Sequence, residues 1–549
     1  MRGEDTALQC TGVEAARSET PRRTSLLLVG FLAVSILAGW LSDGVYHEDD
    51  LTHYQIARWS RHDVRYLLDP WGRPGFTVPY SLVAWVGSSQ DGLRACRVFS
   101  ALIAAATAWL TYCIARSLGL RHAWAAVPLL YLQPLFARLS LTTLTETPLA
   151  FYLALATWLL LTGRNVASAA LMALAPVTRD ESVVLLPIWA WAIWRQGGRW
   201  WTYPLLCWAL VAHNLAAGWW LGVWPASRWL DPAGSSVYGQ GTPLTFIPKV
   251  MQAAGPAIVA LAILGSRRLR RAGLGWVIVL APLAWFLVQT AVYLRGAYSS
   301  GGYSRFLVPI CPWLAVLATA GVRPLLSRRP IAQQALGATI VCLIVLWAVA
   351  EIEWHWRVPL SPADLRTWAL VGRVSALVAA GPLALCAAWL LRARRRACPV
   401  IVAGSAGTAV IGLLVAGLAG FRPLKLAPDQ ASVQGLASVI SRAADEDRLL
   451  VSSTGWVYHW LDRWTGWRGS TDVRGLLDEA EPGTLFVWDA RFCTEMTPRL
   501  TFTEIHDHRG WRQLWPVGDL TEGTPRLALF ECQPLAQASS QPSTPAEEH

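Results

Sequence analysis

The sequence predicts a mainly α-helical membrane protein, a polytopic transmembrane helical bundle of about 13 spans followed by a small C-terminal extracytoplasmic α/β domain. Of its 549 residues, 54% are hydrophobic and 15% are charged, whereas soluble domains carry about 25% charged residues. The apolar residues stand in blocks long enough to cross a hydrocarbon core about 30 Å thick. The chain also contains 32 Trp, a residue that concentrates where membrane and water meet. These observations argue against a single soluble globule.

The first apolar block covers residues 24–42, and the polar segment 1–23 before it is expected to be cytoplasmic. The length of this block and the spans that follow it favour an uncleaved anchor over a cleaved signal peptide. A shorter apolar piece at 76–88 is expected to lie in the membrane interface. The other predicted spans are 94–117, 122–138, 148–163, 165–178, 183–195, 200–222, 251–265, 274–294, 306–322, 331–350, 366–391 and 398–420.

Short clusters of Arg between the spans predict the orientation of the bundle. With a cytoplasmic N-terminus, these clusters fall in alternate loops on the cytoplasmic side, as the positive-inside rule requires. Orientation therefore accounts for the net charge of +11 without a nucleic-acid partner. An odd number of spans then leaves the chain after residue 421 on the outer side. The clustered residues are Arg116, Arg121, Arg164, Arg195, Arg199, Arg267, Arg268, Arg270, Arg271, Arg323, Arg328, Arg329, Arg392, Arg394, Arg395 and Arg396.

Residues 422–532 are predicted to form an extracytoplasmic α/β domain, because helical and strand patterns alternate there. Helices are expected at 432–444 and 472–480, and strands at 448–452, 484–489 and 526–530. The last residues, 533–549, are rich in Ser, Pro, Gln and Glu and are expected to be disordered. Cys493 and Cys532 lie in this domain, where a disulfide and two separate thiols are equal alternatives.

The first outer loop, 43–74, is the most informative segment, because three consecutive carboxylates, Glu48, Asp49 and Asp50, closely follow a predicted span. Their mutual repulsion predicts that at least one of them has a raised pKa or a cationic partner. A carboxylate of that kind is suited to accept a proton from a substrate hydroxyl. The alternative is that these three carboxylates are merely solvated in a loop and accept no proton from a substrate.

The residues that follow predict an amphipathic helix on the membrane surface, with Tyr54 and Trp59 among its apolar residues and Arg58, Arg61 and Arg65 on its polar side. An acidic pair in the first outer loop, followed by an interfacial helix and by Arg73-Pro74, resembles the GT-C class of integral-membrane glycosyltransferases. This class includes protein O-mannosyltransferases, aminoarabinose transferases that modify lipid A, and mannosyltransferases of lipid-linked glycan assembly. The run His47-Glu48-Asp49-Asp50 is similar to the His-Pro-Asp-Glu pattern of the last group, with Glu48 in place of Pro and Asp50 in place of Glu.

Three later features stand in the order that this class shows. Thr145-Glu146 begins a predicted span, similar to the Thr-Glu that often starts the fourth span. The run Arg179-Asp180-Glu181 is similar to the Arg-x-Glu of the third outer loop. The run from Tyr303 through Arg305 to Pro309 resembles the Arg-Tyr/Phe-x-x-Pro that opens a late span. All three features are predicted to lie on the outer side.

The resemblance implies that Asp49 deprotonates or orients the acceptor hydroxyl, with Asp50 as the alternative base. It also suggests that Arg305 holds the phosphate of a polyprenyl-phosphate sugar, for which a guanidinium is suited. The alternative for Arg305 is a side chain that only extends toward the lipid headgroups.

The remaining candidate residues have less specific roles. Glu146 is either a site residue or a cap of the following helix, and Arg179 with Glu181 is either part of the site or a structural ion pair. His47 and His53 flank the carboxylates and are candidates to assist the leaving phosphate or to ligate a divalent metal ion. The expected substrate-binding residues are His47, His53, Tyr54, Glu146, Arg179, Glu181, Tyr303 and Arg305.

The sequence thus predicts that the transmembrane domain, 24–421, moves a sugar from a polyprenyl-phosphate-linked donor to a hydroxyl of a lipid, polysaccharide or protein acceptor at the outer membrane face. Membrane lipids are the other expected partners. Lys249 and Lys425 are the only lysines; this composition suits a GC-rich genome and favours a bacterial inner membrane. The alternative is a transporter or flippase of lipid-linked glycans, which predicts charges lining a central cavity.

Overall fold

A computed structural model gives the fold of the chain, in which contacts between residues define two units. The helical unit comprises Met1–Ser42, Arg73–Phe76 and Cys96–Pro423, and the polar unit comprises Asp43–Gly72, Thr77–Ala95 and Leu424–His549. The residues that the structure describes are 4–227, 240–270, 273–326, 417–443, 448–452, 454–464, 477, 480–490, 493, 500–507, 510–517 and 526–534.

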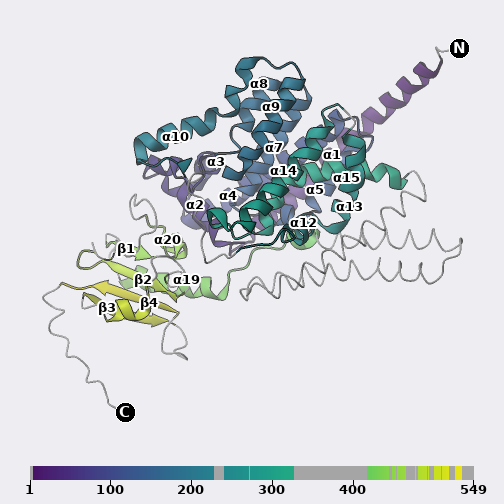
Figure 1. The fold of residues 1–549 in the computed structure, drawn as a ribbon. Helices are drawn as coiled ribbons and strands as arrows, with labels where there is room; N and C mark the ends of the chain where they lie inside the picture. Colours follow the sequence, from purple (N-terminus) through teal and green to yellow (C-terminus); the bar gives the residue numbers. More distant parts are fainter. Residues whose placement is uncertain are drawn as a thin grey trace. The chain divides into compact units, whose positions relative to one another are not determined.

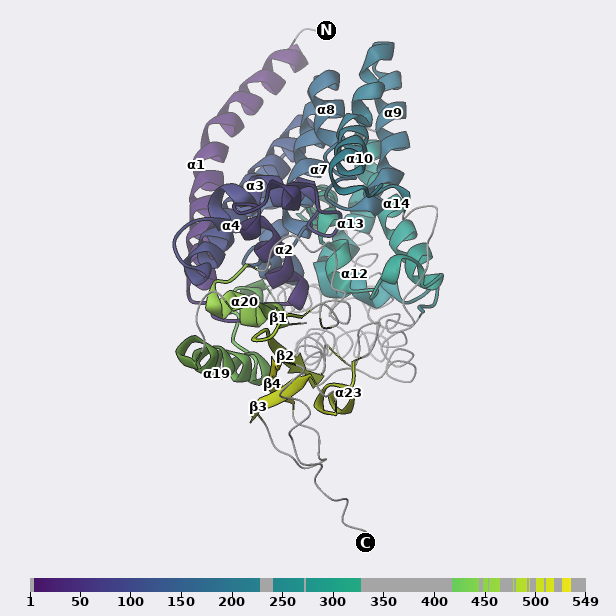
Figure 2. The same ribbon diagram turned by 90° about the vertical axis from the view of Figure 1, so that its left-hand side faces the viewer.

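Helices make up the described part of the helical unit, as the sequence predicts (Figure 1). Figure 2 shows α7, α8 and α9 running side by side. The helices are α1 (Glu4–Trp40), α4 (Ser89–Ser117, which begins in the polar unit), η2 (Ala123–Ala125), α5 (Ala126–Tyr131), α6 (Pro134–Leu139), α7 (Glu146–Leu161), α8 (Asn165–Met172), η3 (Asp180–Leu185), α9 (Leu186–Arg195), η4 (Trp200–Thr202), η5 (Pro204–Leu206), α10 (Trp208–Leu221), α12 (Phe246–Ala254), α13 (Pro256–Leu269), α14 (Gly275–Leu294), η7 (Ala297–Ser299), η8 (Ser304–Ile310) and α15 (Cys311–Leu326).

Four helical stretches among the described residues are long and apolar enough to cross a membrane. They are Arg22–Trp40, Ser89–Ser117, Gly275–Leu294 and Ser304–Val322, and each overlaps a predicted span. A fifth crossing is possible if α12 and α13 count as one span bent by 100°. The bend falls at Gly255, whose φ of 85° suits glycine, and at Pro256, which has no backbone N–H to donate to the helix.

Other predicted spans are divided into short helices, and prolines stand at the breaks. The span 122–138 divides into η2, α5 and α6, and α6 begins at Pro134. The span 200–222 divides into η4, η5 and α10, and η5 begins at Pro204. The predicted spans 331–350 and 366–391 and most of 398–420 lie outside the described residues. The number of 13 spans therefore stays a prediction.

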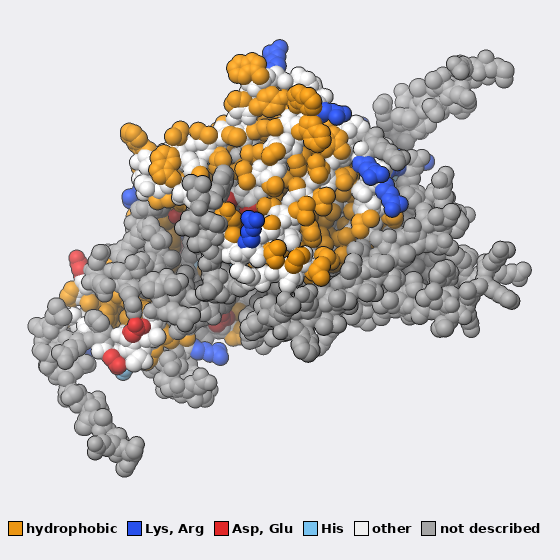
Figure 3. All heavy atoms as spheres, viewed as in Figure 1, with side chains coloured by type: hydrophobic (Ala, Val, Ile, Leu, Met, Phe, Trp, Pro, Cys, Tyr) orange, Lys and Arg blue, Asp and Glu red, His pale blue; other side chains and the backbone are white. Residues whose placement is uncertain are grey.

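The face of the helical unit seen in Figure 3 carries many hydrophobic side chains, and Lys and Arg side chains stand at a few places on it. Such a surface suits contact with lipid. Large exposed side chains on this unit include Trp194, Trp219 and Leu287. In water such a surface would mark an interaction site or an aggregation risk, so it supports the predicted integral membrane protein.

Two glycines allow α13 and α15 to pack closely. A Cβ added at Gly265 would lie 1.9 Å from the carbonyl oxygen of Leu317, and one added at Gly321 would lie 2.1 Å from that of Leu261. Small residues of this kind let the backbones of membrane helices approach each other. The pair therefore explains how these two helices meet without large side chains between them.

Replacing Gly265 by Ala is expected to destabilise the protein by about 1–3 kcal/mol, because the added methyl group overpacks this contact. The measurement is the unfolding transition of the purified protein in detergent. Gly30→Ala in α1 is the matched control, since a Cβ there meets nothing within 4 Å and Ala favours a helix more than Gly does. Equal transitions for the two variants would contradict the expected contact.

The polar unit combines helices from the first predicted outer loop with a small sheet from the C-terminal region. The sheet has the order β1-β2-β4-β3, with β1 parallel to β2 and the other two pairs antiparallel. Its elements are α2 (Glu48–Trp59), η1 (Val64–Leu68), α3 (Pro74–Ala84, which begins in the helical unit), α19 (Pro428–Ala443), β1 (Leu450–Ser452), α20 (Gly455–Leu461), β2 (Leu485–Asp489), α23 (Phe502–His506), β3 (Trp511–Val517) and β4 (Leu527–Cys532).

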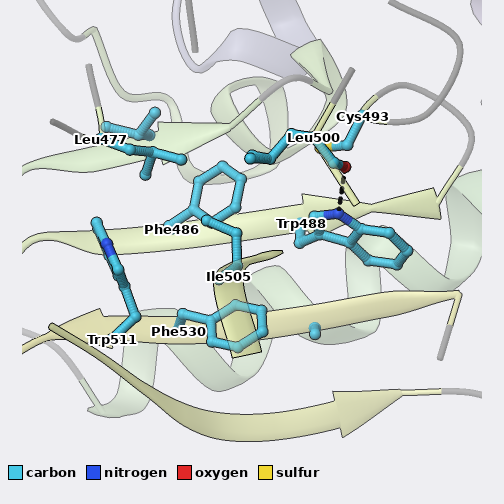
Figure 4. Packing of buried hydrophobic residues seen from close by; sticks show 10 residues of the cluster. Leu477, Phe486, Trp488, Cys493, Leu500, Ile505, Trp511 and Phe530 are labelled. Carbon is cyan, nitrogen blue, oxygen red and sulfur yellow. Dashed lines mark hydrogen bonds between the residues drawn. The ribbon is translucent and has the colours of Figure 1, made fainter. Parts of the chain in front are cut away.

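Apolar side chains beside the sheet form the core of the C-terminal region (Figure 4). Phe486, Trp488 and Phe530 come from the central strands β2 and β4, and the Trp488 Nε1–H donates to the carbonyl oxygen of Leu500 at 3.1 Å. Cys493 is buried in this core and, like Cys532, is a thiol in the structure. Of the two alternatives for these cysteines, the structure has the separate thiols.

The predicted α/β pattern of the C-terminal region is confirmed. The helix expected at 432–444 and the three expected strands correspond to α19, β1, β2 and β4. The edge strand β3 was not predicted, because it contains Pro516 and an irregular register near Gln513, features typical of edge strands. The helix expected at 472–480 and the tail 533–549 lie almost entirely outside the described residues.

Candidate functional site

The acidic residues of the first outer loop form the first turn of α2. His47 caps this helix, and its Nδ1 accepts a hydrogen bond from the backbone N–H of Asp49 at 3.2 Å. Glu48, Asp49 and Asp50 then occupy the first turn, where the positive end of the helix dipole favours carboxylates. The local sequence thus explains both where the helix begins and why three adjacent acids are tolerated there.

The three carboxylates have different surroundings. Glu48 accepts a hydrogen bond from the Trp456 Nε1–H at 2.9 Å. Asp50 is 0% exposed, and its carboxylate accepts the backbone N–H of Tyr46 at 3.2 Å. The Asp49 side chain keeps 27% of its surface exposed, with Oδ2 3.5 Å from His47 Nδ1. Asp49 is therefore more accessible to a substrate hydroxyl than Asp50.

The predicted helix after the carboxylates is confirmed as α2, but Arg58 does not lie on a solvated polar side. Its guanidinium is mostly buried and binds the carboxylate of Asp462, with Nε–Oδ1 and Nη2–Oδ2 distances of 2.8 and 2.7 Å. Burial lowers the pKa of Arg58, but the hydrogen bond and charge of Asp462 outweigh this effect and raise it. The partner lies 404 positions away, so the local pattern carried no signal for it.

Tyr54 and His53 are also buried in the polar unit. The Tyr54 hydroxyl donates to the carbonyl oxygen of Ser89, and the His53 ring stacks on Trp71 with a centroid distance of 6.3 Å. Among the residues that the structure describes, no group of three or more His, Cys, Asp or Glu side chains is arranged to hold a metal ion. The metal-ligand role of His47 and His53 stays an expectation.

A second group of predicted residues meets within the helical unit, around Arg179. Its guanidinium donates from Nη1 to Glu146 Oε1 at 2.7 Å and from Nη2 to Glu181 Oε1 at 3.0 Å. Arg305 Nε lies 3.7 Å from the same Glu146 oxygen. The three later sequence features, far apart along the chain, therefore form one cluster, which we call the Arg179 cluster (Glu146, Arg179, Glu181 and Arg305).

Aromatic rings line this cluster. The Arg179 guanidinium carbon lies 4.2 Å from the centroid of Phe306, and that of Arg305 lies 4.8 Å from the centroid of Tyr303. Attraction between a cation and a ring face adds to the ion pairs and is strongest where water is excluded. The predicted site residue Tyr303 thus contacts Arg305, its near neighbour in sequence.

The Arg179 cluster is buried and formally neutral, with two guanidiniums and two carboxylates. Glu146 is 1% exposed, and its Oε2 has no hydrogen-bond partner among the described residues. Burial raises the pKa of Glu181, but the charge and hydrogen bonds of Arg179 outweigh it and hold that pKa at about 2. Both carboxylates are therefore bound by a guanidinium instead of solvated.

The surroundings of Glu146 leave both of its alternatives open, whereas those of Arg305 bear on its orientation. Glu146 is the first residue of α7, and its carboxylate binds Arg179; the dipole at that helix end also favours it. The Arg305 side chain is 4% exposed and lies against Glu146, so it does not extend toward headgroups. For Arg179 and Glu181, an ion pair is present, which is compatible with both a structural and a site role.

Two basic residues of the helical unit were not among the predicted site residues, although Arg73 belongs to the Arg73-Pro74 motif. Arg73 pairs with Asp180 at 2.9 Å, and its φ of 63° is unusual for a residue other than glycine. Lys249 on α12 is buried, donates to the carbonyl oxygen of Gly302 and faces the rings of Phe246 and Tyr293. The rarity of lysine in this chain was the one available signal for Lys249.

Both the sequence and the fold of the chain are similar to those of known proteins. Residues 81–220 match the family described as dolichyl-phosphate-mannose-protein mannosyltransferase. No curated protein matches this sequence. The structure is similar to that of ArnT from Cupriavidus metallidurans bound to undecaprenyl phosphate, with 16% sequence identity, a TM-score of 0.59, and coverage of 92% of this chain and 97% of that chain.

The apo structure of the same ArnT protein is similar at a TM-score of 0.56, again with 16% identity and the same coverage. At this level of identity the likeness concerns the fold, while the family match concerns one segment of the sequence. Both agree with the resemblance predicted from the motifs. The chain therefore has the fold of ArnT, and its residues 81–220 have the sequence pattern of the matched mannosyltransferase family.

Proposed function

We propose that this protein transfers a sugar from a polyprenyl-phosphate-linked donor to an acceptor hydroxyl at the outer face of a bacterial inner membrane, with Asp49 as the base. The observation that carries the base assignment is the geometry of α2. Asp49 is partly exposed beside His47, whereas Asp50 is fully buried and Glu48, also partly exposed, binds Trp456. The similar ArnT structure bound to undecaprenyl phosphate supports the class of donor.

The proposed reaction is a single displacement. The acceptor oxygen attacks the anomeric carbon while Asp49 takes the hydroxyl proton, and the bond between the anomeric carbon and the polyprenyl phosphate oxygen breaks. The phosphate leaves with the bonding electron pair. Arg305 is the proposed phosphate contact, because a guanidinium matches phosphate geometry and offsets the developing negative charge.

Mass analysis of glycolipids and glycans from cells that lack this protein tests the proposed activity. We expect the acceptor to lose the mass of one hexose or pentose and the polyprenyl-phosphate sugar to accumulate. Reintroducing the full-length chain should restore the acceptor. Accumulation of a complete lipid-linked glycan on the inner leaflet, with every sugar present, would instead indicate the transporter or flippase.

A further inference from the structure

Helix α20 of the C-terminal region binds the end of α2 away from its acidic turn. Asp462, which directly follows α20, forms the two hydrogen bonds to Arg58 described above and also accepts the backbone N–H of Ser89 at 3.1 Å. The remaining Arg58 donors reach the carbonyl oxygens of Ala84 and Gly87 at 2.7 and 2.9 Å. Arg58 thus joins α2, the turn after α3 and the end of α20.

The acidic end of α2 is bound by the same helix. Trp456, 1% exposed on α20, donates its indole N–H to Glu48, the residue directly before Asp49. Between the two ends, the side-chain amide of Gln55 donates to the Gly455 carbonyl oxygen. Since Glu48 and Arg58 are ten positions apart, these contacts extend over about 15 Å of helix, which restricts both the rotation and the sliding of α2. Figure 2 shows the two helices side by side.

The backbone of Asp462 adds an independent observation. Its φ is 49° and its ψ is 41°, a left-handed conformation in a residue other than glycine. A left-handed residue commonly ends a helix, and Asp462 caps the C-terminal end of α20 in this way. The conformation brings the carboxylate to Arg58 and Ser89, so the end of α20 coincides with its connection to α2.

We propose that α20 is a positioning element for the proposed base, so that Trp456 and Asp462 determine where the Asp49 carboxylate lies. The proposal rests on the proposed function, since it assigns these residues to the same reaction. They act through α2 and do not contact the substrate. The C-terminal region is thereby a part of the acidic site and is required for its activity.

The expected effect of loosening α2 follows from the sensitivity of catalysis to geometry. A displacement of about 1 Å at a reacting group can cost about 100-fold in rate. Trp456→Phe removes the indole donor to Glu48, and Asp462→Asn removes the charge that Arg58 binds. We expect each variant to lower sugar transfer by about 10- to 100-fold, with binding of undecaprenyl phosphate unchanged.

Two matched controls separate positioning from general stability. Trp488→Phe removes an indole donor from an equally buried Trp whose partner, Leu500, lies in the sheet core. Glu531→Gln removes a carboxylate that pairs with Arg448 and Arg512 on the sheet. Both controls change the same unit without changing a contact of α2, so transfer should remain within about twofold of the unmodified protein.

The experiment uses the full-length protein in lipid nanodiscs and in cells that lack their own copy. Hydrogen exchange of residues 48–58 reports the mobility of α2, binding of undecaprenyl phosphate reports the donor-lipid interaction, and mass analysis of the acceptor reports transfer. We expect faster hydrogen exchange of α2 and reduced sugar transfer in Trp456→Phe and Asp462→Asn, and neither change in the two controls. If Asp462→Asn does not fold, Trp456→Phe and Gln55→Leu carry the test.

The proposal is overturned if both α20 variants transfer normally while Asp49→Asn is inactive, or if the controls lose as much transfer as the α20 variants. Failure of the proposed function has a different signature. In that case Asp49→Asn itself transfers normally, and the exchange data alone show whether α20 holds α2.

Discussion

Replacing Asp49 by Asn is expected to lower sugar transfer by about 10²- to 10⁴-fold, the range typical of a lost general base. The amide has nearly the same shape as the carboxylate, so α2 and its cap at His47 should persist. An amide cannot accept the proton of the acceptor hydroxyl, however, and the attacking oxygen would have to form its bond while still protonated. The measurement is the mass of the acceptor glycan in cells that produce the variant as their only copy.

Two neighbouring variants control for local structure. Glu48→Gln keeps an oxygen that can accept from Trp456, and we expect it to retain most of the transfer. Asp63→Asn changes a carboxylate of the same unit that pairs with Arg65 and should have little effect. If Asp49→Asn transfers normally and Asp50→Asn is inactive, the base is Asp50, and the assignment based on exposure is incorrect.

Replacing Arg179 by Leu is expected to destabilise the protein by about 3–5 kcal/mol, because it removes one partner of a buried ion-pair network. Glu146 and Glu181 would lose the hydrogen bonds that now satisfy them at 2.7 and 3.0 Å. Arg305 lies 3.7 Å from Glu146 and cannot replace both contacts without moving. The measurement is the unfolding transition in detergent, with the amount of folded protein in membranes as a second readout.

The matched control is Arg65→Leu, which removes a guanidinium that pairs with Asp63 and keeps 40% of its side-chain surface exposed. Exposed ion pairs contribute little, because water and salt screen them, so the transition should stay nearly unchanged. Double replacement of Arg179 and Glu146 by Leu and Gln should recover part of the lost stability, since it removes a charge that the single variant leaves buried. A single variant as stable as the unmodified protein would show that the cluster is solvated.

The resemblance to family motifs singled out the members of the Arg179 cluster, which stand at the ends of apolar blocks on one predicted side. Glu146, Arg179 and Arg305 each occur next to a predicted span boundary, and charges there are costly unless they are paired. The order of the motifs along the chain then indicated that these residues belong to one site. Their pairing geometry depends on how α7, η3 and η8 pack, which no local pattern specifies, so the sequence left the roles of Glu146 and Arg305 open.

The contacts of α2, by contrast, could not be predicted from the sequence. The amphipathic pattern predicts the helix itself, but a solvated and a buried Arg58 fit that pattern equally well. Burial depends on Asp462, whose position in the sequence is unrelated to that of α2. Helix α20 was also missed, because its seven residues are rich in aromatic and β-branched types, whose local preference is for strands.

The sequence by itself determined the membrane class, the main apolar helices, the α/β pattern of the C-terminal region and the identity of the acidic residues. These features follow from composition, periodicity and short motifs, which act over a few neighbouring residues. Only the tertiary structure decided that Asp49 stays partly exposed while Asp50 is buried, that Arg179 joins Glu146 to Glu181, and that Asp462 binds Arg58. The physical reason is that burial and ion pairing arise between segments far apart in the chain, where local propensity carries no information.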